Sequence, residues 1–147
     1  MTIILNKNSF ITKEDADIYF DERYDSKIWQ EADDETKEKL LITASKKINS
    51  FDYTGEKADE TQPMEFPRNF GTPQDIKDAV CEEAISMLSQ ENNIHKKNQE
   101  NNISSISLGA GSVSYSGVQK TAFEKEMISH TAIYLISKWM KKGYAIG

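Results

Sequence analysis

All three prolines of this chain lie close together, at Pro63, Pro67 and Pro73. Proline lacks the backbone N–H and clashes with the preceding helical turn, so it breaks the interior of a helix or a central strand. Residues 51–71 are therefore predicted to form an irregular connection. Thr72 and Pro73 mark its end, because a cap hydroxyl followed by proline is typical of a helix N-terminus. Regular structure must accordingly form on either side of this connection.

Elsewhere in the chain, apolar residues recur three and four positions apart, which predicts amphipathic helices that share one core. Thr12 is the expected N-cap of the first helix and Asp33 or Asp34 that of the second. Between these helices, Trp29 is expected to be buried in a short turn. The predicted helices cover about residues 12–24, 34–50, 73–90 and 120–142. The predicted core consists of Phe20, Leu41, Ala44, Ile48, Ile76, Val80, Ala84, Leu88, Phe123 and Met127.

Two further segments predict a flexible stretch and a β-hairpin. Residues 89–102 are polar, rich in asparagine and without periodicity, so a flexible linker is expected. Residues 103–117 alternate apolar and polar side chains around Gly109 and Gly111, which indicates a short β-hairpin before the last helix. The expected fold is mainly α, a bundle of about four helices with this hairpin, in a single domain over residues 1–147.

The charge balance argues against two classes of partner. The chain has 24 acidic and 18 basic residues and a net charge of −6. Domains that grip nucleic acid usually have a strong basic excess, and anionic lipid also attracts cations. No apolar run approaches the length of a membrane span, and the N-terminus shows no signal-peptide pattern. We therefore expect a soluble protein that is made in the cytoplasm and does not bind membranes.

No group of side chains with catalytic or metal-binding spacing stands out. His95 and His130 have no partner at metal-ligand spacing. Cys81 is the only cysteine, which excludes an internal disulfide, and it is most simply a small buried hydrophobic residue. We expect no enzyme activity, no metal site and no cofactor.

The C-terminal segment mixes basic and aromatic side chains, at Lys138, Trp139, Lys141, Lys142 and Tyr144. One interpretation is a surface on which the bases of single-stranded DNA stack. The other is a helix end whose lysines complement the helix dipole and whose tryptophan anchors the helix. Both interpretations stay open at this point.

Several short motifs follow one another in a recognisable order. They are Asn8–Thr12, Glu14–Phe20, Arg23, Trp29, Ala32–Asp33, Leu40–Ala44, Gln62, Phe66–Arg68, Ile76–Glu82 and the stretch from Ile106 to Ser116. Their order and spacing resemble the small head–tail connector proteins of tailed bacteriophages, which are also called adaptor or head-completion proteins. Some members of this group carry a primosomal, DnaT-like single-stranded-DNA-binding label.

The resemblance implies a structural role. The resembling proteins form a homo-oligomeric ring, commonly a dodecamer, beneath the portal protein at the capsid vertex, and the ring extends the DNA channel. This chain would then bind the portal protein, copies of itself and a downstream neck or tail-completion protein, while DNA passes without specific binding. It would assemble in the host cytoplasm and reside in the neck of the virion. The alternative function is that of a single-stranded-DNA-binding replication accessory protein.

The two arginines both fall inside the matching motifs. Because the guanidinium group suits bidentate and buried pairing, each is expected to hold a defined geometry. Arg23 is expected to pair with the acidic second helix, and Arg68 to hold the 51–71 connection or reach a neighbouring subunit. The C-terminal tail is expected to dock on the portal protein. The predicted interface residues are Arg68, Tyr115, Lys138, Trp139, Lys141, Lys142 and Tyr144.

Overall fold

The computed structural model describes residues 2–101 and 127–141, with side chains described for residues 2–90 and 127–141. In these ranges the chain is mainly helical and has isolated β-bridges in place of strands. The helices are α1 (Lys13–Asp21), α2 (Lys27–Glu31), α3 (Asp34–Asn49), α4 (Gln74–Asn101) and α7 (His130–Ser137). The mainly helical fold class is confirmed, and the predicted hairpin at 103–117 lies outside the described residues.

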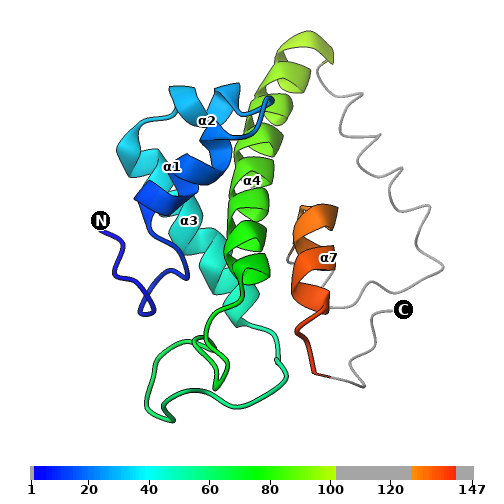
Figure 1. Ribbon diagram of the computed structural model, residues 1–147. Coiled ribbons are helices and arrows are strands. Elements are labelled where there is room, and N and C mark those ends of the chain that lie inside the picture. Colours follow the sequence, from blue (N-terminus) through cyan, green and yellow to red (C-terminus); the bar gives the residue numbers. More distant parts are fainter. Residues whose placement is uncertain (1, 102–126, 142–147) are drawn as a thin grey trace, which may run out of the picture.

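The long helix α4 is the centre of the bundle. The N-terminal helices α1, α2 and α3 lie on one side of α4, and α7 lies on the other (Figure 1). Helices α3 and α7 have the most extensive contacts with α4, while α1 and α2 pack against it over smaller areas. The connection between α3 and α4 runs below the bundle as an irregular loop, as the prolines predict.

Two helices begin where the sequence predicts. The hydroxyl of Thr12 accepts a hydrogen bond from the backbone N–H of Asp15 at 3.1 Å, at the start of α1. The carboxylate of Asp33 accepts one from the N–H of Thr36 at 2.8 Å, at the start of α3. These bonds satisfy donors that a helix leaves unpaired in its first turn. The bonds from Thr36 also lower the pKa of Asp33, because they favour its ionised form.

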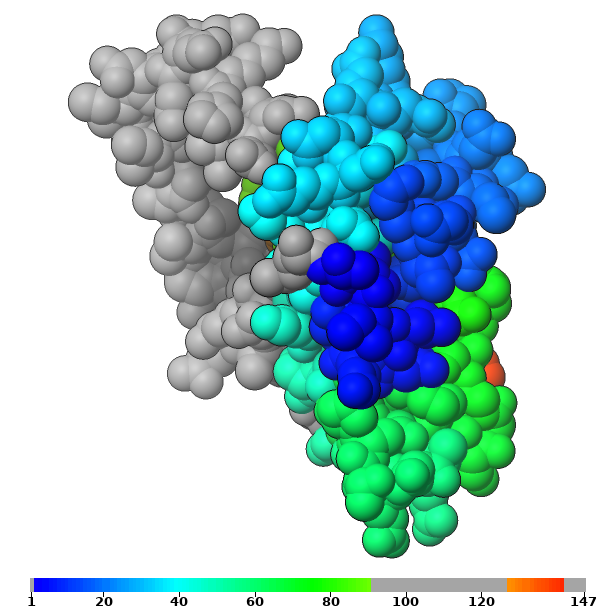
Figure 2. All heavy atoms as spheres, turned by 90° about the vertical axis from the view of Figure 1, so that its left-hand side faces the viewer, coloured from blue at the N-terminus to red at the C-terminus, as the bar shows by residue number. Residues whose placement is uncertain are grey.

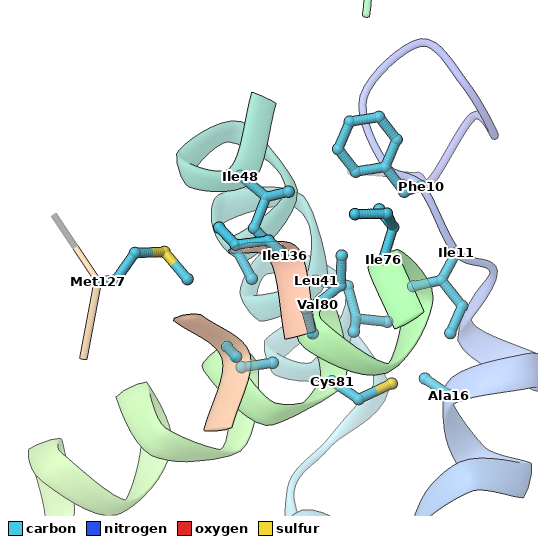
Figure 3. Packing of buried hydrophobic residues seen from close by; sticks show 14 of the residues in the cluster. Phe10, Ile11, Ala16, Leu41, Ile48, Ile76, Val80, Cys81, Met127 and Ile136 are labelled. Carbon is cyan, nitrogen blue, oxygen red and sulfur yellow. The ribbon is translucent and has the colours of Figure 1, made fainter. Parts of the chain in front are cut away.

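One hydrophobic core joins the described helices (Figure 3). Side chains from α3, α4 and α7, such as Leu41, Val80 and Ile136, are fully buried in it. The segment before α1 adds Phe10 and Ile11. The predicted core is confirmed for Phe20, Leu41, Ala44, Ile48, Ile76, Val80, Ala84, Leu88 and Met127, whereas Phe123 lies outside the described residues.

The expected turn around Trp29 is the single-turn helix α2, and the burial of this side chain is confirmed. The indole ring packs against Phe20 with a centroid distance of 4.5 Å, and its N–H donates to Asp17 at 3.0 Å. Burial alone raises the pKa of Asp17, but hydrogen bonds from Lys13 and Trp29 outweigh it and lower the pKa below its usual value. Asp17 therefore ties α2 to α1 through the indole of Trp29.

Two helices differ in extent from the prediction. Helix α4 continues to Asn101, through most of the 89–102 segment that we expected to be a flexible linker. That segment contains Gln, Glu and Lys, which favour helix, and extending an existing helix costs far less than nucleating one. The last helix, expected over 120–142, covers His130–Ser137, because Ser129 is extended and caps it. Residues 120–126 lie outside the described part of the chain.

Truncation of a core side chain tests this packing. We expect Leu41→Ala to lower the free energy of unfolding by about 2–5 kcal/mol, because it leaves a cavity between α3 and α4. Urea denaturation followed by circular dichroism measures the change. The matched control is Thr43→Ala, two residues away on the exposed face of α3, which we expect to change stability by less than about 0.5 kcal/mol. Equal unfolding curves for both variants would contradict the assigned helix face.

Candidate interaction surfaces

A buried carboxylate on α4 fixes the position of α7. The side chain of Glu83 is fully buried, and its oxygens accept hydrogen bonds from the backbone N–H groups of Ile128 and Ser129 at 2.9–3.1 Å. Lys47 of α3 completes the site with an ion pair at 2.8 Å. A negative charge is favourable at a helix N-terminus, because the unpaired N–H groups donate hydrogen bonds to it and the positive end of the helix dipole attracts it. Glu83 therefore connects α3, α4 and the start of α7.

The other end of α7 is held by the connection between α3 and α4. The N–H of Thr54 donates to the carbonyl of Trp139 at 2.9 Å, and the N–H of Lys141 donates to the carbonyl of Asp52 at 3.1 Å. The indole N–H of Trp139 also donates to Asp75 at 3.1 Å, near the start of α4. The two ends of α7 are thus attached to different parts of the bundle.

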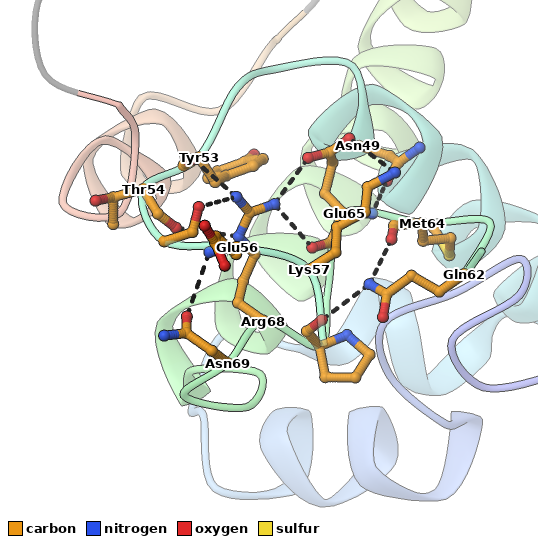
Figure 4. Close-up of polar contacts among 12 residues, drawn as sticks. Asn49, Tyr53, Thr54, Glu56, Lys57, Gln62, Met64, Glu65, Arg68 and Asn69 are labelled. Carbon is orange, nitrogen blue, oxygen red and sulfur yellow. Dashed lines mark hydrogen bonds and ion pairs between the residues drawn. The ribbon is translucent and has the colours of Figure 1, made fainter. Parts of the chain in front are cut away.

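Arg68 organises this connection from within (Figure 4). Its guanidinium donates to the carbonyls of Tyr53, Thr54 and Gly55 at 2.6–3.0 Å. It also donates to the carbonyl and the carboxylate of Glu65, at 3.2 and 2.9 Å. A guanidinium has five N–H donors, and these contacts use them all.

The burial of Arg68 agrees with this structural role, since only 7% of the residue is exposed. Gln62 supports the same loop by donating to the carbonyls of Met64 and Pro67 at 2.7 and 2.8 Å. Asn49 ties it to α3 by accepting from the N–H of Glu65 at 2.7 Å. Of the two roles expected for Arg68, the structure supports the one in which it holds the 51–71 connection.

Arg23 has a different partner from the expected one. Its guanidinium bonds to Glu82 of α4 at 2.8 Å and to the nearby Asp25 at 2.5 Å, and among the described residues it makes no ion pair with α3, which is the predicted second helix. Glu82 also accepts a hydrogen bond from the hydroxyl of Tyr19. Burial and the hydrogen bond to Glu82 raise the pKa of Tyr19 well above its ordinary value, so the hydroxyl stays a donor. The expected pairing with the second helix was wrong, because α4 rather than α3 lies opposite this face of α1.

An aromatic–basic surface lies around the C-terminal half of α7; we define it by Phe70, Tyr134, Lys138, Trp139 and Lys141. The Trp139 ring packs on Phe70 with a centroid distance of 5.4 Å, and the ammonium of Lys138 lies 4.8 Å from the centre of the Tyr134 ring. Tyr134 is 64% exposed and Phe70 is 44% exposed. Exposed aromatic side chains with polar residues around them are typical of a surface that contacts another molecule.

An acidic groove lies between α1 and the first turns of α4; we define it by Asp15, Ile18, Glu22, Lys77 and Asp78. Tyr19 and Gln74 also line it, and its volume is about 460 Å³. Ile18 is 59% exposed, so the groove presents an apolar side chain between carboxylates. Its volume falls within the range of about 300–1,000 Å³ that binding clefts occupy.

The predicted interface residues fall into three groups. Lys138, Trp139 and Lys141 come together in the aromatic–basic surface, although Trp139 is engaged with Asp75 and Phe70. Arg68 lies inside the loop rather than on this surface. Tyr115, Lys142 and Tyr144 lie outside the described residues. Phe70 and the groove residues were missed by the sequence analysis, because an exposed aromatic residue in a loop and carboxylates on an exposed helix face give no periodic signal.

Cys81 is fully buried, as predicted, and burial raises the pKa of its thiol. Within residues 2–90 and 127–141, no group of three or more His, Cys, Asp or Glu side chains is arranged to hold a metal ion. Of the helices described, none is long and apolar enough to cross a bilayer.

The fold and its surfaces define a small acidic helical-bundle protein. More particularly, the chain belongs to the family described as "Putative DnaT-like ssDNA binding protein", whose model matches residues 2–145. Neither the curated proteins nor the solved structures contain a match to this chain. The family description agrees with the single-stranded-DNA-binding alternative raised by the sequence, and it does not test the connector interpretation.

The buried carboxylate gives a direct test of how α7 is held. We expect Glu83→Gln to lower the free energy of unfolding by about 3–5 kcal/mol, because it leaves the ammonium of Lys47 without its partner. Hydrogen exchange should show that the amides of α7 lose protection before those of α1. The matched control is Glu35→Gln, an exposed residue of α3, which we expect to leave both measurements unchanged. Wild-type stability of Glu83→Gln would show that the charge of Glu83 is not needed to hold α7.

Proposed function

We propose that this chain is a structural subunit of a phage head–tail connector, which docks beneath the portal protein and links capsid to tail. One observation carries the proposal: the motifs that resemble connector proteins converge on a single core. Phe10, Ile11, Phe20 and Trp29 from the N-terminal motifs, and Phe66, Ile76 and Val80 from the later ones, are all buried together. The resemblance therefore involves the residues that determine the fold.

Several arginine and lysine side chains pair within the chain, which also supports a role in which DNA passes without being bound. Binding to a DNA backbone depends on lysines and arginines that are free to meet phosphates. Here Arg23 and Arg68 bond within the chain, and Lys13 and Lys47 pair with Asp17 and Glu83. The net charge of −6 also disfavours binding to phosphates.

The proposed partners follow from this role. The subunit binds the portal protein, other copies of itself in a ring, and a downstream neck or tail-completion protein. The aromatic–basic surface and the acidic groove are the two described surfaces that suit such contacts, since each combines exposed apolar side chains with charge. In this role the protein assembles in the host cytoplasm and resides in the neck of the virion.

The second candidate function is binding of single-stranded DNA, which the family description favours. The aromatic–basic surface is where it would occur, because bases stack on exposed aromatic rings while lysines meet the backbone. Tyr134, Phe70 and Lys138 supply both features. However, Lys138 already faces Asp75 at 3.8 Å, which reduces the positive charge available to a phosphate.

Attachment to capsids distinguishes these functions. We expect the purified chain to bind capsids that carry the portal protein of the same phage genome, and not portal-free capsids, which are the matched control. Sedimentation of the particles followed by protein detection measures binding. We also expect no binding of a fluorescent oligothymidylate at micromolar protein in physiological salt, because the chain has a net charge of −6 and both of its arginines bond within the chain.

The opposite pattern would establish the second candidate. In that case the chain would bind neither kind of capsid and would bind the oligonucleotide, with an affinity that falls steeply as the salt concentration rises. Lys138→Glu would then abolish oligonucleotide binding, whereas Lys27→Glu, which alters an exposed lysine of α2 outside this surface, would reduce it much less.

A further inference from the structure

The two described surfaces have opposite charge. The acidic groove contains the carboxylates of Asp15, Glu22 and Asp78 against the single ammonium of Lys77. The aromatic–basic surface contains Lys138 and Lys141, both of which are exposed, although Lys138 also faces Asp75 of its own chain at 3.8 Å. Complementary charge of this kind orients two proteins and fixes their register, even where it adds little to affinity.

The apolar parts of the two surfaces are also complementary. Ile18 in the groove and Tyr134 on the aromatic–basic surface are both more than half exposed. The groove, with a volume of about 460 Å³, is open enough to receive a side chain from another molecule. A contact between these two surfaces would pair apolar area with apolar area and positive charge with negative.

The helices that carry most of the two surfaces lie on different sides of α4, and the surfaces approach each other at the first turns of α4, where Asp75 contacts Lys138 and Trp139. In Figure 1, α1 and α7 are on opposite sides of α4. In Figure 2, the N-terminal residues, α3 and the loop before α4 face the viewer, and only a small orange area of α7 is visible at the edge. A subunit with this arrangement can offer one surface to each of two neighbours.

We propose that the acidic groove of one copy receives the aromatic–basic surface of the next, with Tyr134 packing on Ile18 and Lys138 facing Asp78. Because two different surfaces meet, the contact is heterologous, and repeated contacts form a ring if the rotation closes. This inference rests on the proposed ring and names the surfaces that build it.

Cross-linking of cysteine variants tests the contact in the full-length purified chain. We expect the double variant Ile18→Cys, Tyr134→Cys, treated with a short bis-maleimide, to give a ladder of covalent oligomers on a denaturing gel. A mixture of the two single variants should stop at the dimer, and each single variant alone should give monomer. Cys81 contributes no background, because it is fully buried and burial raises the pKa of its thiol.

Matched controls separate this contact from random collision. The pair Thr43→Cys, Tyr134→Cys places one cysteine on the exposed face of α3 instead of in the groove and should give no ladder. Adding Lys138→Glu to the original pair should abolish the ladder, because it places a carboxylate against Asp78. Adding Asp78→Lys as well should restore the ladder, because the two charges are then opposite again. A variant that had simply failed to fold would not regain the ladder in this way.

Each other outcome overturns the inference. Dimers from a single variant would indicate a contact between identical surfaces, and absence of the ladder would exclude the proposed pairing. If Lys138→Glu left the ladder unchanged, the proposed contact between Lys138 and Asp78 would be wrong. Capsid attachment without a ladder would contradict this inference alone, whereas a ladder without capsid attachment would contradict the connector function alone.

Discussion

The buried carboxylate of Glu83 is the interaction on which the arrangement of this bundle depends. It lies in the first half of α4, pairs with Lys47 of α3, and accepts hydrogen bonds from two backbone N–H groups at the start of α7. A buried charge is tolerated only when it is paired and hydrogen-bonded, so this site requires all three partners at once. The position of α7, and with it the aromatic–basic surface, follows from this requirement.

The loop between α3 and α4 is held by a second polar centre. Its prolines exclude regular structure, so its backbone carbonyls need other donors, and Arg68 supplies them. The same loop then bonds to the end of α7 through Thr54 and Asp52. Both arginines therefore serve the fold: Arg68 within this loop, and Arg23 between α1 and α4.

The sequence predicted the parts of this structure that depend on local pattern. The helix faces, the caps Thr12 and Asp33, and the burial of Trp29 and Cys81 follow from periodicity and from short-range hydrogen bonding. Glu83 could not be recognised, because a glutamate in a helix is usually exposed and its burial here depends on α7, distant in sequence. The groove was missed for the same reason, since it exists only where α1 meets α4.

The central claim is that this chain is a structural part of the phage neck, and electron cryomicroscopy of the complete particle tests it most directly. The account predicts a ring of small helical subunits directly beneath the portal protein, into which α1, α3, α4 and α7 fit as one body. Particles assembled without the chain should lack that ring and carry no tail. A neck without such density, in normally tailed particles that do not contain the chain, would contradict the account.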